Sequence, residues 1–224
     1  MKTKLWIGLT AALITAGCAS TSIITNSWKA DNVAAKKYNK ILVLGIIRDS
    51  DRGLREKMEN HFVGDLKDLG YDAVSSLKEY GPNAFNNMDE ESAVNKIKYS
   101  GMDAVITIVL LDRKKERNYV PGYMHFSPYG YYYNRFWGYH STLYRRIYES
   151  GYYVNESKYF WESNFYDMSD QKLIYSVHTN SFDPVNTESM AHEYGRMIVK
   201  NMVKQSVLKN QNNPMASSSS PGAH

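Results

Sequence analysis

Residues 40–47 read KILVLGII, an apolar run with β-branched residues on both alternating faces. A strand with one buried face alternates apolar and polar residues, whereas a strand buried on both faces reads as a continuous apolar run. Residues 103–111, DAVITIVLL, have the same character. The two segments therefore predict central strands of a sheet that helices cover on both sides.

Helical and strand patterns alternate between these two runs. Residues 51–70 repeat apolar side chains at three- and four-residue steps, and Gly70 is placed to end that helix. A strand is predicted over 71–76, and a helix over 87–100. The order strand–helix–strand–helix–strand predicts parallel pairing with right-handed crossovers.

The second half of the chain predicts antiparallel strands. Residues 158–166 and 172–179 are aromatic and β-branched runs separated by a short polar turn, which is the pattern of a hairpin. A last helix is predicted over 187–208, capped by Asn186. Together the segments predict one α+β domain over 38–208, with a mixed sheet of about five strands covered by three helices.

The N-terminus has the pattern of a bacterial export signal. Residues 5–17 form an uncharged run of thirteen residues after Lys2 and Lys4, and Cys18 follows at once. As a helix the run would cover only about 20 Å, less than the ~30 Å hydrocarbon core, so residues 1–17 are predicted to be a signal peptide. The sequence TAGC at 15–18 resembles the lipobox of bacterial lipoproteins. This resemblance implies that Cys18 carries lipid, palmitate included, and becomes the new N-terminus.

The predicted anchor limits the location and the partners of the protein. Acyl chains on Cys18 would make the membrane itself a partner. In lipoproteins an aspartate after the cysteine retains the protein at the inner membrane, so Ala19 and Ser20 imply the outer membrane, facing the periplasm. Residues 18–37 are predicted to be a lipidated tether, which would span at most ~70 Å when fully extended. The tail 209–224 is predicted to be disordered.

Charge and cysteine content exclude several classes of protein. Cys18 is the only cysteine, so no disulfide framework and no CxxC metal site can form. Loss of residues 1–17 removes two of the 27 basic residues and leaves 25 against 23 acidic ones. This near balance gives no reason to expect nucleic acid as a partner.

The most unusual segment is residues 119–153, which we call the tyrosine tract. It reads YVPGYMHFSPYGYYYNRFWGYHSTLYRRIYESGYY and holds 11 of the chain's 19 tyrosines. A segment this long without clear periodicity is uncommon in a compact domain, and is usually functional or disordered. The residues predicted to bind a partner are Tyr123, Tyr129, Tyr131, Tyr132, Tyr133, Arg135, Trp137, Tyr139, Tyr144 and Arg145.

Several roles are open for the tyrosine tract. Tyrosine and tryptophan present flat amphipathic surface to a protein partner at low entropic cost. The same rings could stack on an envelope glycan, with arginines binding its anionic groups, or could lie at the level of lipid headgroups. Alternatively, the tract could form two long strands whose tyrosines pack across the sheet, or a loop without a ligand.

The sequence predicts no catalytic residue, no metal and no cofactor. Its histidines share no ligand spacing, and neither HExxH nor GxSxG is present. Residues 48–53 follow the first central strand, where open α/β sheets bind ligands, but they lack the glycines of a phosphate loop. We therefore expect a helix cap with local ion pairs there. The acids Asp65 and Asp68 are expected to be solvated.

The order of elements behind a lipobox resembles a group of small, mostly uncharacterised bacterial outer-membrane lipoproteins. Glu162, the turn NFYD at 164–167 and the strand KLIYS at 172–176 match motifs that recur in that group. A more distant similarity is to the periplasmic domains of the curli-secretion lipoprotein and the lipoprotein activator of penicillin-binding proteins. The resemblance implies work by protein contact and assembly.

These observations lead to one preferred function and three alternatives. The preferred function is a non-enzymatic envelope lipoprotein that binds another envelope component, a protein above all, through the tyrosine tract. The alternatives are an oligomeric structural or pore-forming secretion subunit, a glycan- or peptidoglycan-binding module, and a cell-wall hydrolase. The sequence leaves the oligomeric state undetermined.

Overall fold

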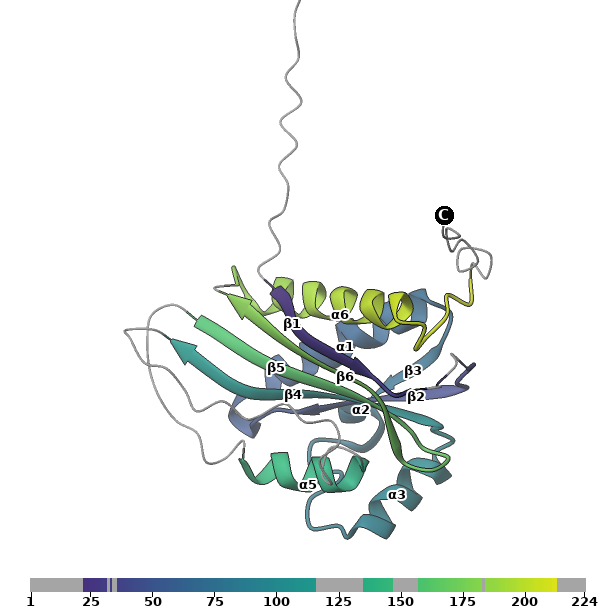
Figure 1. Cartoon of the computed structure of the whole chain (residues 1–224). Helices are drawn as coiled ribbons and strands as arrows, with labels where there is room; N and C mark the ends of the chain where they lie inside the picture. The colour runs from purple at the N-terminus through teal and green to yellow at the C-terminus, as the bar shows by residue number, and fades with distance from the viewer. Residues whose placement is uncertain are drawn as a thin grey trace, which may run out of the picture.

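Within the described residues the sheet is mixed and has six strands. The computed structural model describes residues 22–31, 33, 36–115, 135–146, 157–182 and 184–212. The strands are β1 (Ser22–Lys29), β2 (Lys40–Ile46), β3 (Asp72–Ser75), β4 (Ala104–Lys115), β5 (Ser157–Asp167) and β6 (Lys172–Phe182), in the spatial order β1-β6-β5-β4-β2-β3 (Figure 1). β2 pairs in parallel with β3 and β4, and the other neighbours are antiparallel. The predicted α+β class is confirmed.

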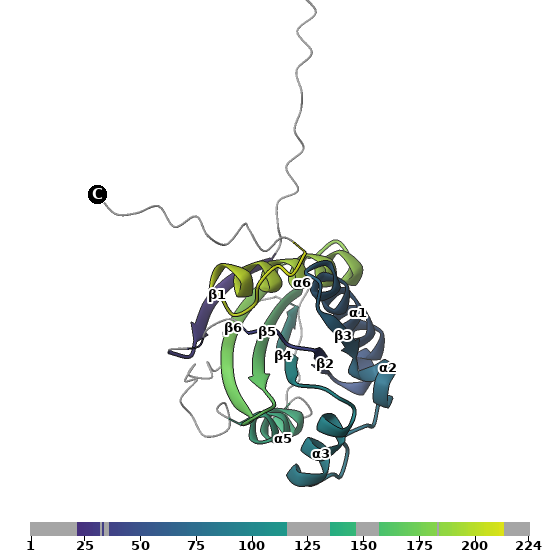
Figure 2. The same cartoon turned by 90° about the vertical axis from the view of Figure 1, so that its right-hand side faces the viewer.

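Helices cover both faces of this sheet. They are the 3₁₀ helix η1 (Asp49–Asp51) and the α-helices α1 (Arg52–Asp68), α2 (Ser76–Tyr80), α3 (Glu90–Tyr99), α5 (Phe136–Arg146) and α6 (Thr187–Lys204). Figure 2 shows α1 and α6 above the sheet and α3 and α5 below it. Within the described part of the chain, no helix combines the length and the apolar character needed to cross a membrane.

Strand β2 explains why both faces are covered. Ile41 and Val43 point into the core under α1 and α6, while Leu42 and Leu44 point into the core above α3 and α5. Each of these side chains is at most 2% exposed. Successive side chains of a strand alternate between faces, so a run that is apolar at every position needs a helical layer on each side.

Two predicted helix caps agree with the structure, although the helices predicted over 87–100 and 187–208 are shorter, at Glu90–Tyr99 and Thr187–Lys204. Gly70 has a φ of +89° just after α1, and this left-handed backbone is open to glycine without steric cost. The side chain of Asn186 accepts a hydrogen bond from the Ser189 backbone N–H and caps α6. Residues 49–51 (DSD) depart from the prediction of a helix cap. They form η1 without a side-chain cap, and Asp51 pairs instead with Arg113 of β4 at 2.9 Å.

The prediction that residues 18–37 form a tether is corrected for 22–29. These residues form β1, which pairs with β6 from Ser22 opposite Ser181 to Lys29 opposite Tyr175. An edge strand keeps part of its surface in water, so it needs little apolar character and its sequence is only weakly patterned. The tail prediction is also corrected at its start. Gln211 donates its backbone N–H to Leu69, so residues 209–212 pack against the end of α1.

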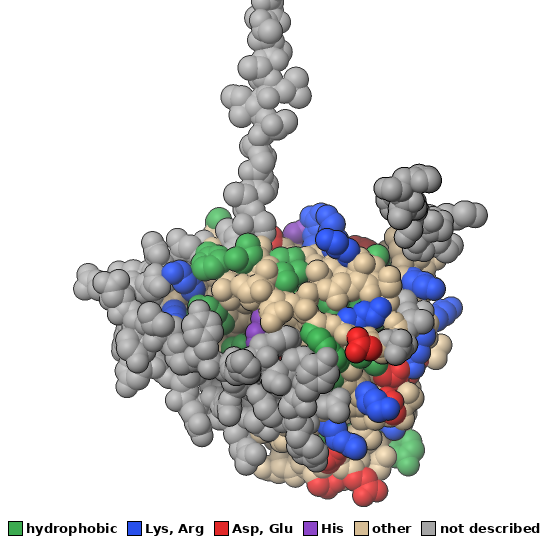
Figure 3. All heavy atoms as spheres, in the orientation of Figure 1, with side chains coloured by type: hydrophobic (Ala, Val, Ile, Leu, Met, Phe, Trp, Pro, Cys, Tyr) green, Lys and Arg blue, Asp and Glu red, His purple; other side chains and the backbone are tan. Residues whose placement is uncertain are grey.

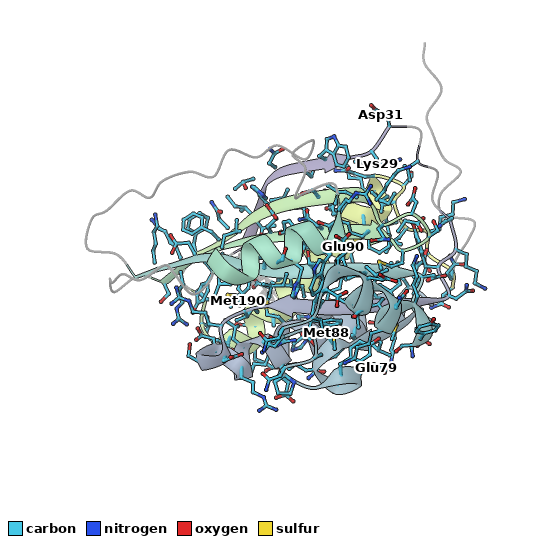
Figure 4. All side chains as sticks on the ribbon, turned by 90° about the horizontal axis from the view of Figure 1, so that it is seen from below. Lys29, Asp31, Glu79, Met88, Glu90 and Met190 are labelled. Carbon is cyan, nitrogen blue, oxygen red and sulfur yellow. The ribbon has the colours of Figure 1, made fainter. Side chains whose placement is uncertain are left out.

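Part of the tyrosine tract is helical. α5 covers residues 136–146, where the sequence suggested a loop or long strands. α3 and α5 are neighbours across the lower face of the sheet, which Figure 4 shows from below. The other residues of the tract lie outside the described part of the chain.

Candidate functional site

Helix α5 fastens the middle of the tyrosine tract to the core. Phe136 and Tyr139 are fully buried, and Trp137 and His140 are at most 9% exposed. The Trp137 and His140 rings stack with centroids 4.9 Å apart, and the Phe136 ring meets Tyr166 of β5 edge-on at 5.7 Å. These four side chains come from one turn and a half of helix, and they close the core between α3 and the sheet.

His140 is held neutral in this core. Burial, and to a smaller extent the positive charge of Arg55, lower the pKa of His140 to about 4. An imidazole enclosed by Phe85, Phe136 and Trp137 has little solvent to stabilise its protonated form. We therefore expect protonation of His140 at acid pH to weaken the packing of α5.

The predicted binding residues fall into three groups. The prediction that Trp137 and Tyr139 bind a partner is wrong, because their rings are buried and pack in the core. Arg135 is exposed and pairs through its backbone with Lys172 at the start of β6. The remaining predicted residues stay predictions, because Tyr123, Tyr129 and Tyr131–Tyr133 lie outside the described residues, as do the side chains of Tyr144 and Arg145.

A polar row lies on the same face of the sheet as α5. Glu162, Asn164 and Tyr166 are two residues apart on β5, so their side chains share one face. Glu162 is fully buried and receives a hydrogen bond from the Asn164 amide at 3.0 Å. Its other oxygen lies 2.5 Å from Nε2 of His178 on β6. Burial, followed by the charge of Glu162, raises the pKa of the Tyr166 hydroxyl well above its usual value.

The row fixes the orientation of His178. A carboxylate that holds one ring nitrogen is the usual means of setting a histidine's tautomer. The His178 side chain keeps 16% exposure, whereas its partner Glu162 keeps none. The motifs shared with the group of small lipoproteins include Glu162 but do not include His178. The register of the predicted hairpin would not have found it, because a bulge between Phe165 and Tyr166 shifts the pairing by one residue and brings His178, not Val177, opposite Glu162.

A second buried glutamate occupies the carboxyl ends of the parallel strands. Glu59 of α1 accepts hydrogen bonds from the backbone N–H groups of Gly45 and Leu77, each at 2.9 Å. Ser75, Ser76 and Arg55 also donate to it. Ligands bind at this edge in many open α/β sheets. Here the protein's own carboxylate holds the strand ends together, and all its contacts are internal.

The arrangement of these acids does not favour hydrolysis. Within the described residues the buried glutamates are Glu59 and Glu162, and they belong to separate networks. A hydrolase of cell-wall glycan needs two carboxyl groups facing one bond. No group of three His, Cys, Asp or Glu side chains in the described ranges could hold a metal ion.

An open hollow of about 480 Å³ lies between α1 and α6. Its lining includes Lys57 and His61 of α1 and Glu188 of α6. Glu188 is 2.5 Å from Nε2 of His61 and 3.5 Å from Nζ of Lys57, so the charges at this hollow pair with one another. The described part of α5, with the tyrosine tract around it, remains the candidate site.

Comparison with known proteins gives likeness of fold only. No protein-family model matches the chain, and no curated protein matches it in sequence. A variant PelC dodecamer from Paraburkholderia phytofirmans is similar over 82% of this chain and 98% of its own, with 12% identity and a TM-score of 0.42. A second PelC dodecamer is similar over 85% and 99%, with 10% identity and a TM-score of 0.45. Lipoprotein GNA1162 from Neisseria meningitidis is similar over 75% and 96%, with 13% identity and a TM-score of 0.36.

These coverages and TM-scores describe a likeness in the arrangement of helices and strands. Identities of 10–13% and TM-scores below 0.5 carry no argument about function. The resemblance to outer-membrane lipoproteins therefore stays a prediction, and the function has to be argued from the residues of this chain.

Proposed function

We propose that this protein is a non-enzymatic bacterial envelope lipoprotein, anchored through lipid on Cys18, that binds another envelope protein through the tyrosine tract. The anchor is supported by the short apolar signal that ends directly before the chain's only cysteine. The outer membrane, seen from the periplasm, is the location that Ala19 and Ser20 favour.

One observation carries the binding role. Helix α5 uses Phe136, Trp137, Tyr139 and His140 to fill the core, so its inner side is accounted for by packing. Nine of the tract's 11 tyrosines lie in sequence on either side of α5, at 119–134 and 147–153. A fixed helix between these segments lowers the entropy lost when they bind, and tyrosine is a favoured residue of protein interfaces.

Crosslinking in intact cells tests this proposal. A photoreactive amino acid replaces Tyr132 in the tract, and the matched control replaces Tyr99 of α3, which is 89% exposed and lies outside the tract. We expect a discrete protein adduct from position 132 and none from position 99. Capture of a second copy of this chain would favour the oligomeric alternative. Equal capture at both positions, or none at 132, would contradict a specific interface.

The structure determines which tract variant is informative. Deletion of residues 120–152 would remove the buried side chains of α5 and unfold the domain. Replacement of Tyr131, Tyr132 and Tyr133 by serine leaves those side chains in place, and is expected to abolish the adduct formed from position 129. The anchor is tested separately, because Cys18→Ser should move the protein out of the membrane fraction.

A further inference from the structure

The exposed side of α6 carries a line of basic residues. Five exposed positions recur at intervals of four residues along α6, in a line that winds slowly around its outer surface: Glu188, His192, Arg196, Lys200 and Lys204. The opposite side, which includes Tyr194 and Ile198, is buried in the core. The last three positions of the line give α6 a positively charged outer face, and Lys and Arg side chains stand out above α6 in Figure 3.

This helix runs beside the strand that leads to Cys18. At one end of β1, Ser22 pairs with Ser181, and α6 begins six residues later at Thr187. At the other end, the Gln205 amide just after α6 donates to the Ser27 hydroxyl at 2.7 Å. Figures 1 and 2 both show the start of β1 beside α6 on the same side of the molecule.

The proposed anchor lies very close to this surface. Four residue steps separate Cys18 from Ser22, so the chain can cover at most about 14 Å between them. The earlier estimate of a ~70 Å tether is too long, because β1 takes up most of those residues. A bilayer that holds the lipid on Cys18 must therefore come within about 14 Å of Ser22, beside the first turn of α6, and a bilayer parallel to α6 meets this condition.

Apolar side chains are exposed at the same end. Ile23 of β1 is 48% exposed, and Val185 between β6 and α6 is 89% exposed. Ile23 lies opposite Asn180, five residues before Val185, so both belong to the edge from which the anchor emerges. Only one other large apolar side chain, Tyr99 on the far face, is as exposed in the described part of the chain.

The acids near the basic line are partly compensated. Glu188 pairs with Lys57 and His61 at the first turn of α6. Asp65 of α1 faces α6, where one of its oxygens lies too close to Gly195 for a β carbon to fit, and the positive charge of Arg196 acts on its carboxylate. The second half of the line faces outward as three cations.

We infer that Arg196, Lys200 and Lys204 dock on the anionic headgroups of the membrane that carries the Cys18 lipid, with α6 lying along the bilayer surface. The inference rests on the proposed lipid anchor. Phosphate groups attract clustered basic side chains near a membrane, and each adds about a fivefold factor to binding. Docking orients the domain, because α3 and α5 then face away from the membrane.

A fluorescent label on an added cysteine tests this orientation. Cys18 is the only cysteine, and its sulfur carries the lipid in the mature protein, so an added thiol is labelled uniquely. His192→Cys places the label on the outer side of α6, and Tyr99→Cys places it on α3 as the matched control. The full lipidated protein is reconstituted into phosphatidylethanolamine vesicles, with or without phosphatidylglycerol, that contain a quencher on the lipid headgroup.

We expect strong quenching at position 192 and little at position 99. Quenching at 192 should fall when phosphatidylglycerol is omitted. It should also fall when Arg196, Lys200 and Lys204 are changed to glutamine, which reduces the ratio of docked to free domain by on the order of 100-fold. Equal quenching at the two positions in protein that floats with the vesicles would overturn the docking alone. Protein that does not float with the vesicles would overturn the lipid anchor, and the docking with it.

Discussion

Lowering the pH from 7 to 5 is expected to weaken the folded state through His140, whose side chain is enclosed between Phe85 and Trp137. In the unfolded chain a histidine has a pKa of about 6.5 and gains a proton over this range. In the folded chain burial lowers the pKa of His140 to about 4, so the ring stays neutral. The unfolded state therefore binds more protons, and the free energy of unfolding falls as the pH falls.

The size of the effect follows from the two pKa values. A folded pKa of about 4 against an unfolded value of about 6.5 predicts a loss of about 2 kcal/mol between pH 7 and pH 5. The loss grows to about 3 kcal/mol below pH 4, where both states are protonated. Arg55 contributes in the same direction, because its positive charge opposes a second cation nearby.

Urea denaturation at the two pH values measures this loss. His140→Phe keeps an aromatic ring in the position and removes the titrating group, so it serves as the matched control. The other histidines titrate in both proteins, and the difference between the two pH dependences isolates His140. We expect the variant to lose about 2 kcal/mol less than the natural chain between pH 7 and pH 5. Equal losses in the two proteins would refute the neutral, buried state of this ring.

Three further tests, two of them with a matched control substitution, probe the networks around the core. Gly45→Ala places a β carbon 2.8 Å from a neighbouring side-chain carbon, and we expect it to lower the free energy of unfolding by about 1–3 kcal/mol in the urea assay. The control Gly64→Ala meets nothing within 4 Å and should raise the free energy of unfolding by about 0.5–1 kcal/mol. Burial raises the pKa of Asp65 to about 6, so its charged form destabilises the folded state at pH 7. Asp65→Asn should therefore raise the free energy of unfolding at pH 7 by about 1 kcal/mol, after discounting for exposure. Calorimetry should show that this gain disappears below pH ~4, where the aspartic acid is neutral in the folded and unfolded states. Glu162→Gln weakens the buried pair with His178 and should lower the melting temperature, with a loss of about 2–4 kcal/mol in the free energy of unfolding. The control Glu188→Gln weakens the exposed pair with His61 and should leave the melting temperature nearly unchanged.

Sequence periodicity predicted the central part of the fold. The apolar runs at 40–47 and 103–111, together with the helical spacing of 51–70, determined which segments are buried and on how many sides. Burial of apolar surface is the main driving force of folding, and its pattern along the chain depends only on the local period of each element. Long helical connections predicted the parallel half of the sheet, and a short turn predicted the antiparallel half.

Segments with little apolar periodicity were predicted less well. β1 has a weak pattern because it lies at the edge of the sheet, and only its pairing with β6 identifies it as a strand. The helix α5 lacked a clear signal because its inner side is built from Phe136, Trp137, Tyr139 and His140, which the sequence presents as part of one aromatic run. For this reason Trp137 and Tyr139 were assigned to a partner surface when they belong to the core.

The sequence by itself determined the mixed fold, the predicted lipid attachment at Cys18 and the position of the tyrosine tract. Only the tertiary structure decided which aromatic side chains are buried, which histidine meets Glu162, and that β1, which begins four residues after Cys18, lies beside α6. The physical reason is the range of the interactions. Helix and strand periods are read over a few residues, whereas the contacts of Glu162, α5 and α6 join segments that are far apart in the chain and meet only after the sheet has formed.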